Sequence, residues 1–341
     1  MRTTHRRGDA TLLRPHPRRA VRAEGCCDGA IRHARPAILT DKGALSLGSV
    51  PMSIRLALAT DAAHPGVHPD DAHFVAALVR LGVQPVPCIW NDTSVDWSRF
   101  DTVLIRTVWD YFQRYPQFLG WLDKLDALGV PTVNDSRLLR WNSDKRYLLE
   151  LASLGVDIIP TRLARTAALP ATLQAMHAQE VVVKPTVSGG AWRTLRGVAG
   201  DPAFTQAIAA LPDGDWLVQP FVAEIQRDGE WSLLFFDGAY SHAVRKLPKA
   251  GDYRVQGEHG GSAEPAEPPA AALAAAQAVL AAVSRAGHVE PAYARIDGVM
   301  RDGRFLLMEA ELIEPFLHLA IRPDAAERYA ERLAARLATL G

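Results

Sequence analysis

Four charged residues interrupt a stretch that otherwise has the apolar pattern of a two-stranded hairpin. The stretch 293–312 reads YARIDGVMRDGRFLLMEAEL and contains Arg295, Asp297, Glu309 and Glu311. Side chains alternate between the two faces of a strand, so Arg295 and Asp297 share a face, as do Glu309 and Glu311. Carboxylates that converge repel one another and need a cation between them. Oxygen ligands suit Mg²⁺ or Mn²⁺, and an arginine beside them suits a phosphate group.

The turn of this hairpin decides whether its carboxylates meet. A two-residue turn would split them between the two faces of the sheet. A three-residue loop at 301–303 pairs Asp297 with Leu307 and brings them to one face. We therefore expect the three-residue loop and a metal site made of Asp297, Glu309 and Glu311. The alternative is an antiparallel strand pair with one solvated polar face.

A lysine and a glycine-containing loop follow an earlier apolar strand. The stretch 181–193, VVVKPTVSGGAWR, places Lys184 at a strand end, just before Ser188, Gly189 and Gly190. Glycines let backbone N–H groups approach phosphates, and a lysine there acts as a point charge. The spacing is not that of a Walker A motif. Lys145, near the start of a helix expected from Asn142 or Ser143 to 154, is a second candidate phosphate contact.

The elements that must position these residues fall into two patterns. From residue 54, strands alternate with helices, which indicates a mostly parallel sheet. We expect strands at 54–60, 83–90, 102–107 and 130–134 and helices at 71–81 and 116–129. Ligands bind beyond the carboxyl ends of such strands, so this region should select the substrate, although ordinary loop polarity is the alternative. The candidate residues are Asp61, His64, Arg106, Trp109 and Asp110.

From residue 161 the pattern becomes α+β. We expect strands at 180–185, 215–222, 229–238 and 241–246 and helices at 269–286 and 323–340. The fold class is therefore α/β plus α+β. The expected domains are an N-terminal parallel-sheet domain at 52–136, a central subdomain at 137–218 and a C-terminal subdomain with the metal site at 219–341. Residues 1–51 are Arg-rich, with few large apolar side chains, and are expected to be a disordered extension.

Composition excludes several classes of function. The chain has 341 residues, is 48% hydrophobic and carries no formal net charge, so we expect a large core and no general nucleic-acid surface. No apolar run approaches the roughly 18 residues that span a bilayer. Three cysteines, Cys26, Cys27 and Cys88, make neither a disulfide framework nor a zinc site. We expect a cytoplasmic protein that acts on small molecules.

In their order and spacing, the motifs between 142 and 315 resemble those of the ATP-grasp ligases. The resemblance implies a pre-ATP-grasp domain followed by a two-subdomain ATP-grasp fold, with ATP and Mg²⁺ (or Mn²⁺) as cofactors. Lys145 and Lys184 are similar to the family's two nucleotide lysines. Ser188, Gly189 and Gly190 resemble the loop that closes over the phosphates.

The resemblance also implies roles for later residues. Gln219, Phe221 and Val222 resemble the hinge whose backbone reads the adenine edge, and Glu230 resembles the acid that binds the ribose. Arg254 resembles a phosphate-facing arginine, and Arg295 the arginine that stabilises the transferring phosphoryl group. The implied catalytic residues are Arg295, Arg254 and Lys184, and the implied magnesium ligands are Asp297, Glu309 and Glu311.

One subgroup is more similar still. The segments WDY, DYRVQ and MEAELIEP are similar to those of the O-ureidoserine cyclo-ligase subgroup of cycloserine biosynthesis. The chain departs from the general family pattern at Glu311, where asparagine is usual. It also departs at 312–315, which is one residue longer than the usual Ser-Pro-Gly turn and lacks its glycine. That turn often touches substrate.

The implied reaction is an ADP-forming ligation of the EC 6.3 type. A small amino-acid-like carboxylate would form an acyl phosphate with ATP and then react with an amine. The partners are thus small carboxylate and amine substrates, and a homo-oligomer stays open. His259 is the best candidate general base. The alternatives are a nucleotide-binding ATP-grasp module without turnover and a metal-dependent hydrolase that uses the same carboxylates.

Overall fold

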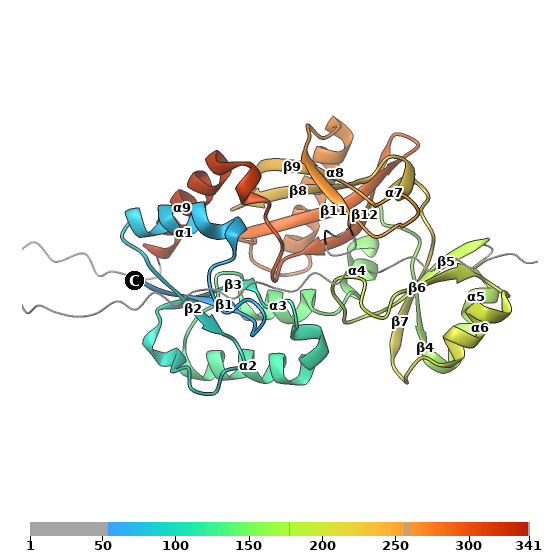
Figure 1. The fold of residues 1–341 in the computed structure, drawn as a ribbon, viewed down its shortest axis with the longest axis horizontal. Helices are drawn as coiled ribbons and strands as arrows, with labels where there is room; N and C mark the ends of the chain where they lie inside the picture. The colour runs from blue at the N-terminus through green and yellow to red at the C-terminus, as the bar shows by residue number, and fades with distance from the viewer. Residues whose placement is uncertain (1–53, 177, 256, 258–259, 340–341) are drawn as a thin grey trace, which may run out of the picture. The chain divides into compact units, whose positions relative to one another are not determined.

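The computed structural model describes residues 54–176, 178–255, 257 and 260–339, which belong to one compact unit. The extension predicted at 1–51 and His259 lie outside these residues. Within them the strands form three sheets (Figure 1), parallel in the first and antiparallel in the other two. This confirms the predicted fold class. No helix among them is long and apolar enough to cross a bilayer.

The first sheet is parallel and has strand order β2-β1-β3. Helices cover both faces of the central strand β1, so its buried side chains are mostly apolar. Ala57 and Ala59 face the core shared with α2, whereas Leu56 and Leu58 face the core shared with α1 and α9. Helices α1 and α9 lie side by side (Figure 1). The bounds are β1 Arg55–Thr60, β2 Gln84–Ile89, β3 Thr102–Thr107, α1 Ala72–Arg80, α2 Tyr115–Leu128 and α9 Pro323–Leu337.

The second sheet is antiparallel and has strand order β10-β9-β8-β11-β12. Helix α8 packs against β11 and β12 through small residues such as Ala272 and Ala276, which let the helix approach closely. Helix α4 lies against α8. The bounds are β8 Glu230–Phe236, β9 Ala239–Leu247, β10 Ser262–Pro265, β11 Tyr293–Arg301, β12 Arg304–Glu311, α4 Tyr147–Ser153 and α8 Ala270–Arg285.

The third sheet has strand order β4-β7-β5-β6, and helices α5 and α6 share one core with it (Figure 1). The prediction found β5 and β7 and missed the other elements. These elements have only four to eight residues, too few for their hydrophobic periodicity to be read reliably from the sequence. The bounds are β4 Arg162–Arg165, β5 Glu180–Pro185, β6 Leu195–Val198, β7 Asp215–Pro220, α5 Leu169–Gln174 and α6 Pro202–Ala209; α7, Glu224–Arg227, lies just beyond.

Two predicted elements are wrong. The stretch 130–134 makes a single parallel bridge, Val103 with Thr132, instead of a strand. The helix predicted from 142 or 143 to 154 begins only at Tyr147, as α4, and a turn that holds Lys145 separates it from an earlier helix that was not predicted, α3 Ser136–Asn142. Asn142 ends α3 and does not cap α4. Its side-chain amide donates to the Ala310 carbonyl at 2.8 Å, and its Oδ1 accepts from the Leu312 amide at 2.9 Å.

The register predicted for the β11–β12 hairpin is also wrong, although the carboxylates do share one face of the sheet as predicted. The turn has two residues, because Arg301 pairs with Arg304. An irregularity between Asp297 and Gly298 then shifts the pairing so that Asp297 lies opposite Glu309. One extra residue in a strand is a β-bulge, which re-aims the side chains beyond it. The carboxylates therefore share a face, as expected, by a bulge instead of by a longer loop.

Candidate active site

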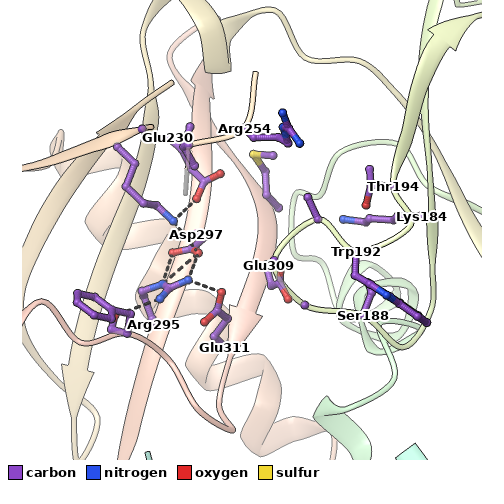
Figure 2. Close-up of a pocket in the computed structure, with 18 of the residues that line it drawn as sticks. Lys184, Ser188, Trp192, Thr194, Glu230, Arg254, Arg295, Asp297, Glu309 and Glu311 are labelled. Carbon is purple, nitrogen blue, oxygen red and sulfur yellow. Dashed lines mark hydrogen bonds and ion pairs between the residues drawn. The ribbon is translucent and has the colours of Figure 1, made fainter. Parts of the chain in front are cut away.

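A cavity of about 820 Å³ gathers the residues that the sequence analysis singled out. This volume lies in the range of small-molecule sites. Figure 2 shows Glu230, Arg295, Asp297 and Glu311 on one side and Lys184 and Ser188 on the other, with Glu309 between them. The predicted site residues that line it are Lys145, Lys184, Ser188, Gly189, Gly190, Gln219, Phe221, Val222, Glu230, Arg254, Arg295, Asp297, Glu309 and Glu311.

Arg295 and Asp297 form the buried centre of the acidic side. The Arg295 Nη2 donates to Asp297 Oδ2 at 2.9 Å and also pairs with Glu311 (Figure 2). Asp297 also accepts a hydrogen bond from the Ser232 hydroxyl at 2.6 Å. Burial disfavours the Asp297 carboxylate, but Arg295 and Lys246 outweigh it and lower the pKa of Asp297. This carboxylate is therefore ionised.

Lys246 is a functional candidate that the sequence analysis missed. Its side chain pairs with Glu230, and its Nζ lies 3.1 Å from Asp297 Oδ2. Lys246 is directly opposite Glu230 in the β8–β9 pairing. No simple sequence signal marked it, because uninterrupted pairing from Phe236 and Ala239 would place Arg245 opposite Glu230, and an irregularity between Leu234 and Phe235 brings Lys246 there instead. One ammonium group thus serves two buried carboxylates.

Two lysines form the basic side of the cavity. The Lys145 Nζ donates to the Ser188 carbonyl at 2.7 Å and to Glu309 Oε1 at 2.6 Å. Burial disfavours the Lys145 ammonium, but Glu309 outweighs burial and the pKa of Lys145 is raised. Burial lowers the pKa of Lys184 to about 8, and Lys145 adds to the effect. Both lysines can reach an anion in the cavity without leaving the protein interior.

The glycine-containing loop packs against the N-terminal part of the chain. A side chain at Gly189 would meet the Phe112 ring at 2.7 Å, so only glycine fits there. The Phe112 and Trp192 rings lie 5.5 Å apart. The loop also contains Ala191 and Arg193 with positive φ, a backbone state that non-glycine residues rarely adopt. Such strain is common where a loop clamps a ligand.

The predicted hinge has several groups already engaged. The Phe221 amide donates to the Glu180 carbonyl at 2.8 Å, and the Phe221 ring lies 3.4 Å from the Arg196 guanidinium carbon. The Gln219 side-chain amide donates to the Thr161 hydroxyl at 2.8 Å. Arg254 lines the cavity and pairs with Asp252 at 2.7 Å. The structure places these residues at the cavity, and their roles toward a nucleotide stay predictions.

The donor set fits a divalent cation. Among the described lining residues, the five acidic side chains equal the five basic ones in number. Phosphate groups that engaged the lysines and arginines would leave the carboxylates without partners. Burial, together with the nearby Asp297 and Glu309, already raises the pKa of Glu311 to about 7. Asp297, Glu309 and Glu311 would hold the cation, and it would neutralise phosphate charge.

No ready-made metal cluster exists without such a ligand. Among the described residues, no group of three or more His, Cys, Asp or Glu side chains is arranged to hold a metal ion. Arg295, Lys246 and Lys145 make the contacts that a cation would replace. The assignment of Asp297, Glu309 and Glu311 as metal ligands therefore stays a prediction.

Only one of the N-terminal residues predicted to select substrate, Trp109, lines the cavity. Arg106 instead forms a buried pair with Asp71 at 2.8 Å. Asp110 accepts from the Trp90 indole at 2.7 Å. Asp61 and His64 bind each other through the His64 Nδ1 at 2.9 Å. The cavity wall here is made by Glu314, from the 312–315 segment singled out above, and by four residues that the prediction did not name: His68, Phe112, Phe316 and His318.

Comparison with known proteins identifies the family. The family model described as "D-cycloserine synthetase DcsG, N-terminal domain" matches residues 56–134. The cycloserine biosynthesis protein DcsG of Streptomyces lavendulae is 36% identical over 297 residues, which cover 83% of this chain and 98% of that protein. The chain belongs to the ATP-grasp ligases. The predicted resemblance, including the cycloserine subgroup, is confirmed.

Solved structures of ATP-grasp ligases share this fold. The crystal structure of D-cycloserine synthetase DcsG matches with a TM-score of 0.73 and 34% identity, over 83% of this chain and 99% of that one. A RimK domain protein ATP-grasp from Sphaerobacter thermophilus matches with a TM-score of 0.61 and 17% identity, over 82% and 99%. The second similarity shows the fold alone. As an ATP-grasp ligase, the chain is an enzyme of the class that couples ligation to ATP.

Proposed function

We propose that this ATP-grasp ligase joins a small amino-acid-like carboxylate to an amine through an acyl phosphate, with release of ADP and phosphate. The observation that carries the proposal is the single cavity that unites two lysines, a glycine loop, Arg295 and three carboxylates. A phosphoryl transfer needs positioning and charge neutralisation more than covalent help from the protein. The activity named for the relative, D-cycloserine synthetase, is consistent with a small substrate.

In the first step a carboxylate oxygen attacks the γ-phosphorus of ATP. The bond from this phosphorus to the β–γ bridging oxygen breaks, and ADP leaves. Lys145 and Lys184 bind the phosphates, and Arg295 meets the charge that develops on the transferring group. A magnesium ion held by Asp297, Glu309 and Glu311 supplies further charge neutralisation when bound.

In the second step the amine nitrogen attacks the carbonyl carbon of the acyl phosphate. The bond from this carbon to the phosphate oxygen breaks, phosphate leaves, and the nitrogen loses a proton. Water would destroy the acyl phosphate, so the site must exclude it. The packing of Phe112 against Gly189 and Trp192 covers the cavity on the loop side.

An isotope experiment tests the acyl phosphate directly. A substrate carboxylate labelled with ¹⁸O donates one labelled oxygen to the phosphorus, so released phosphate should carry one ¹⁸O per turnover. Unlabelled phosphate alongside ligated product would contradict the acyl-phosphate route. ATP hydrolysis that no carboxylate or amine stimulates would favour a nucleotide-binding module, and hydrolysis of substrates without ATP would favour the hydrolase.

A further inference from the structure

The segment 312–317, just after β12, has no regular secondary structure, yet side chains bind the carbonyl oxygens all along its backbone. Each of its six carbonyl oxygens accepts a hydrogen bond from a side chain elsewhere in the chain. In chain order the distances are 2.7, 2.7, 3.1, 3.3, 3.1 and 3.0 Å. The donors, in the same order, are Asn134, Tyr293, Trp109, Arg106, Arg295 and His242. The segment is therefore rigid, although its sequence shows no such order.

This support fixes which side chains face the cavity. Leu312 and Leu317 are fully buried in the apolar cores. Glu314, Phe316 and His318 are partly exposed and line the cavity. A segment held by its backbone presents its side chains in fixed positions, which is what a recognition site needs.

Glu314 stands out among the acids of the cavity. In the described part of the chain its carboxylate forms no ion pair with a lysine or arginine, whereas Glu230, Asp297, Glu309 and Glu311 each form one. A carboxylate removed from bulk water and left without a charged partner is costly. Glu314 is therefore suited to bind a cation from outside the protein.

The rings near Glu314 indicate the kind of cation. The Trp109 indole donates to the Glu314 carbonyl at 3.1 Å, so this ring touches the residue itself. The His68 ring lies 5.3 Å from that of Trp109 and 5.5 Å from that of Phe316. Aromatic faces attract organic ammonium groups. A hard divalent ion instead needs several oxygen ligands, and no such cluster includes Glu314 among the described residues.

We propose that Glu314, with the rings of Trp109 and Phe316, binds an ammonium group of the amino-acid-like substrate. The inference rests on the proposed function and deepens it, because it names the group by which the substrate is recognised. It also gives a physical reason for the atypical segment after β12. The segment places the Glu314 carboxylate in the cavity, on a backbone whose carbonyl oxygens six side chains hold in place.

The experiment uses pairs of probes that differ only in the ammonium group. D- and L-alanine are compared with D- and L-lactate, and D- and L-serine with D- and L-glycerate. The melting temperature of the full chain is measured with each probe in the presence of a non-hydrolysable ATP analogue and Mg²⁺. Glu314→Gln removes the charge and keeps the shape. Glu331→Gln makes the same change at an exposed position outside the cavity and serves as the control.

We expect at least one amino acid to stabilise the wild type while its hydroxy-acid partner does not. In Glu314→Gln the amino acid should bind roughly tenfold more weakly or worse, with the shift caused by the nucleotide unchanged. Glu331→Gln should match the wild type. If Glu314→Gln does not fold, Glu314→Asp, which keeps the charge but withdraws it, should weaken amino-acid binding and retain the preference over the hydroxy acid.

Two results would overturn the assignment while sparing the proposed function. One is a wild type that binds the nucleotide but shows no preference for any amino acid. The other is a folded Glu314→Gln variant that keeps the preference. A wild type that shows no shift with the nucleotide would overturn the proposed function and the assignment together, so the two failures are distinguishable.

Discussion

At the residue scale, Lys246 is the cation on which the acidic side of the cavity depends. It lies between Glu230 and Asp297, and its side chain is 9% exposed. Lys246→Met would keep the apolar stem and leave two buried carboxylates with less compensation. We expect a loss of roughly 3–5 kcal/mol in the free energy of unfolding, as when one partner of a buried ion pair is removed. Urea denaturation measures it.

The matched control is Lys249→Met. Lys249 is exposed and lies outside the cavity lining. The Lys249→Met substitution should change the free energy of unfolding by no more than about 0.5 kcal/mol. If both variants lost the same unfolding free energy, the buried ion pairs of Lys246 would not contribute to stability.

Glu309 tests the metal assignment one residue at a time. Glu309→Gln keeps the size of the side chain and an oxygen that accepts from Lys145, but removes the charge. We expect ligase turnover to fall by roughly a hundredfold or more in a variant that still folds, since electrostatic groups at phosphoryl transfer have effects of this size. Rates of ADP release measure it, and a variant with the wild-type rate would refute the role of Glu309.

The sequence revealed those site residues that belong to a local motif and missed the others. Lys184 and Gly189 lie in a recognisable strand–loop segment, so they were found. Phe112 and Phe316 are contacts between distant parts of the chain, and no local pattern marks them. Arg106 looked like a substrate contact because it ends a parallel strand. The structure shows that it instead bonds Asp71 and the Pro315 carbonyl.

At the element scale, the bulge in the β11–β12 hairpin decides where the carboxylates point. The turn sequence allowed two registers, and neither includes a bulge. The bulge depends on close packing that local turn chemistry does not encode. A side chain at Gly298 would lie 2.4 Å from the Leu306 carbonyl oxygen and 2.4 Å from the Phe305 ring. Glycine is therefore needed beside the bulge for steric reasons.

This steric argument predicts the effect of Gly298→Ala. The added methyl group should force the strands apart and cost about 1–3 kcal/mol of stability, with a loss of ligase activity because Asp297 and Glu309 move. Gly120→Ala in helix α2 is the control, since nothing lies within 4 Å of the added atom. It should be neutral or stabilising by up to about 1 kcal/mol. Thermal melts compare the two, and a harmless Gly298→Ala would contradict the packing argument.

Longer elements were predicted well, and the error at Lys145 has a clear cause. Strands β1 and β3 and helix α8 have strong apolar patterns, and their tertiary contacts favour the same secondary structure as the local sequence. The stretch 142–154 also has helix-forming residues. The chain nevertheless breaks before Tyr147, where the Lys145 amide donates to the Thr186 carbonyl at 2.7 Å. That contact lies about forty residues away in sequence, so propensity could not indicate it.

At the scale of the whole molecule, stability should depend on pH through a buried histidine. The His242 Nε2 lies 3.0 Å from the Leu317 carbonyl oxygen. Burial lowers the pKa of His242 from 6.5 to about 4. Since the folded pKa is depressed, protons bind the unfolded chain first. The contribution of a neutral His242 is therefore full above pH 6.5 and is lost as the pH falls toward 4.

His242→Gln isolates this effect, because its amide can still donate to Leu317 but does not titrate. Between pH 7 and pH 4 the wild type should lose up to about 3 kcal/mol more of its unfolding free energy than the variant. Urea denaturation at a series of pH values measures the difference. Parallel pH profiles for the two proteins would show that His242 is not buried in its neutral form.

The central claim is that the cavity binds ATP together with Mg²⁺ through the hairpin carboxylates. The most direct test is the melting temperature of the full chain with a non-hydrolysable ATP analogue, with and without Mg²⁺, for the wild type and Glu309→Gln. A ligand at 100 times its dissociation constant adds about 2.7 kcal/mol, or roughly 4 °C here. We predict a rise in the wild type that requires Mg²⁺ and shrinks in Glu309→Gln. A folded wild type with no rise, or a rise equal with and without Mg²⁺, would contradict the account.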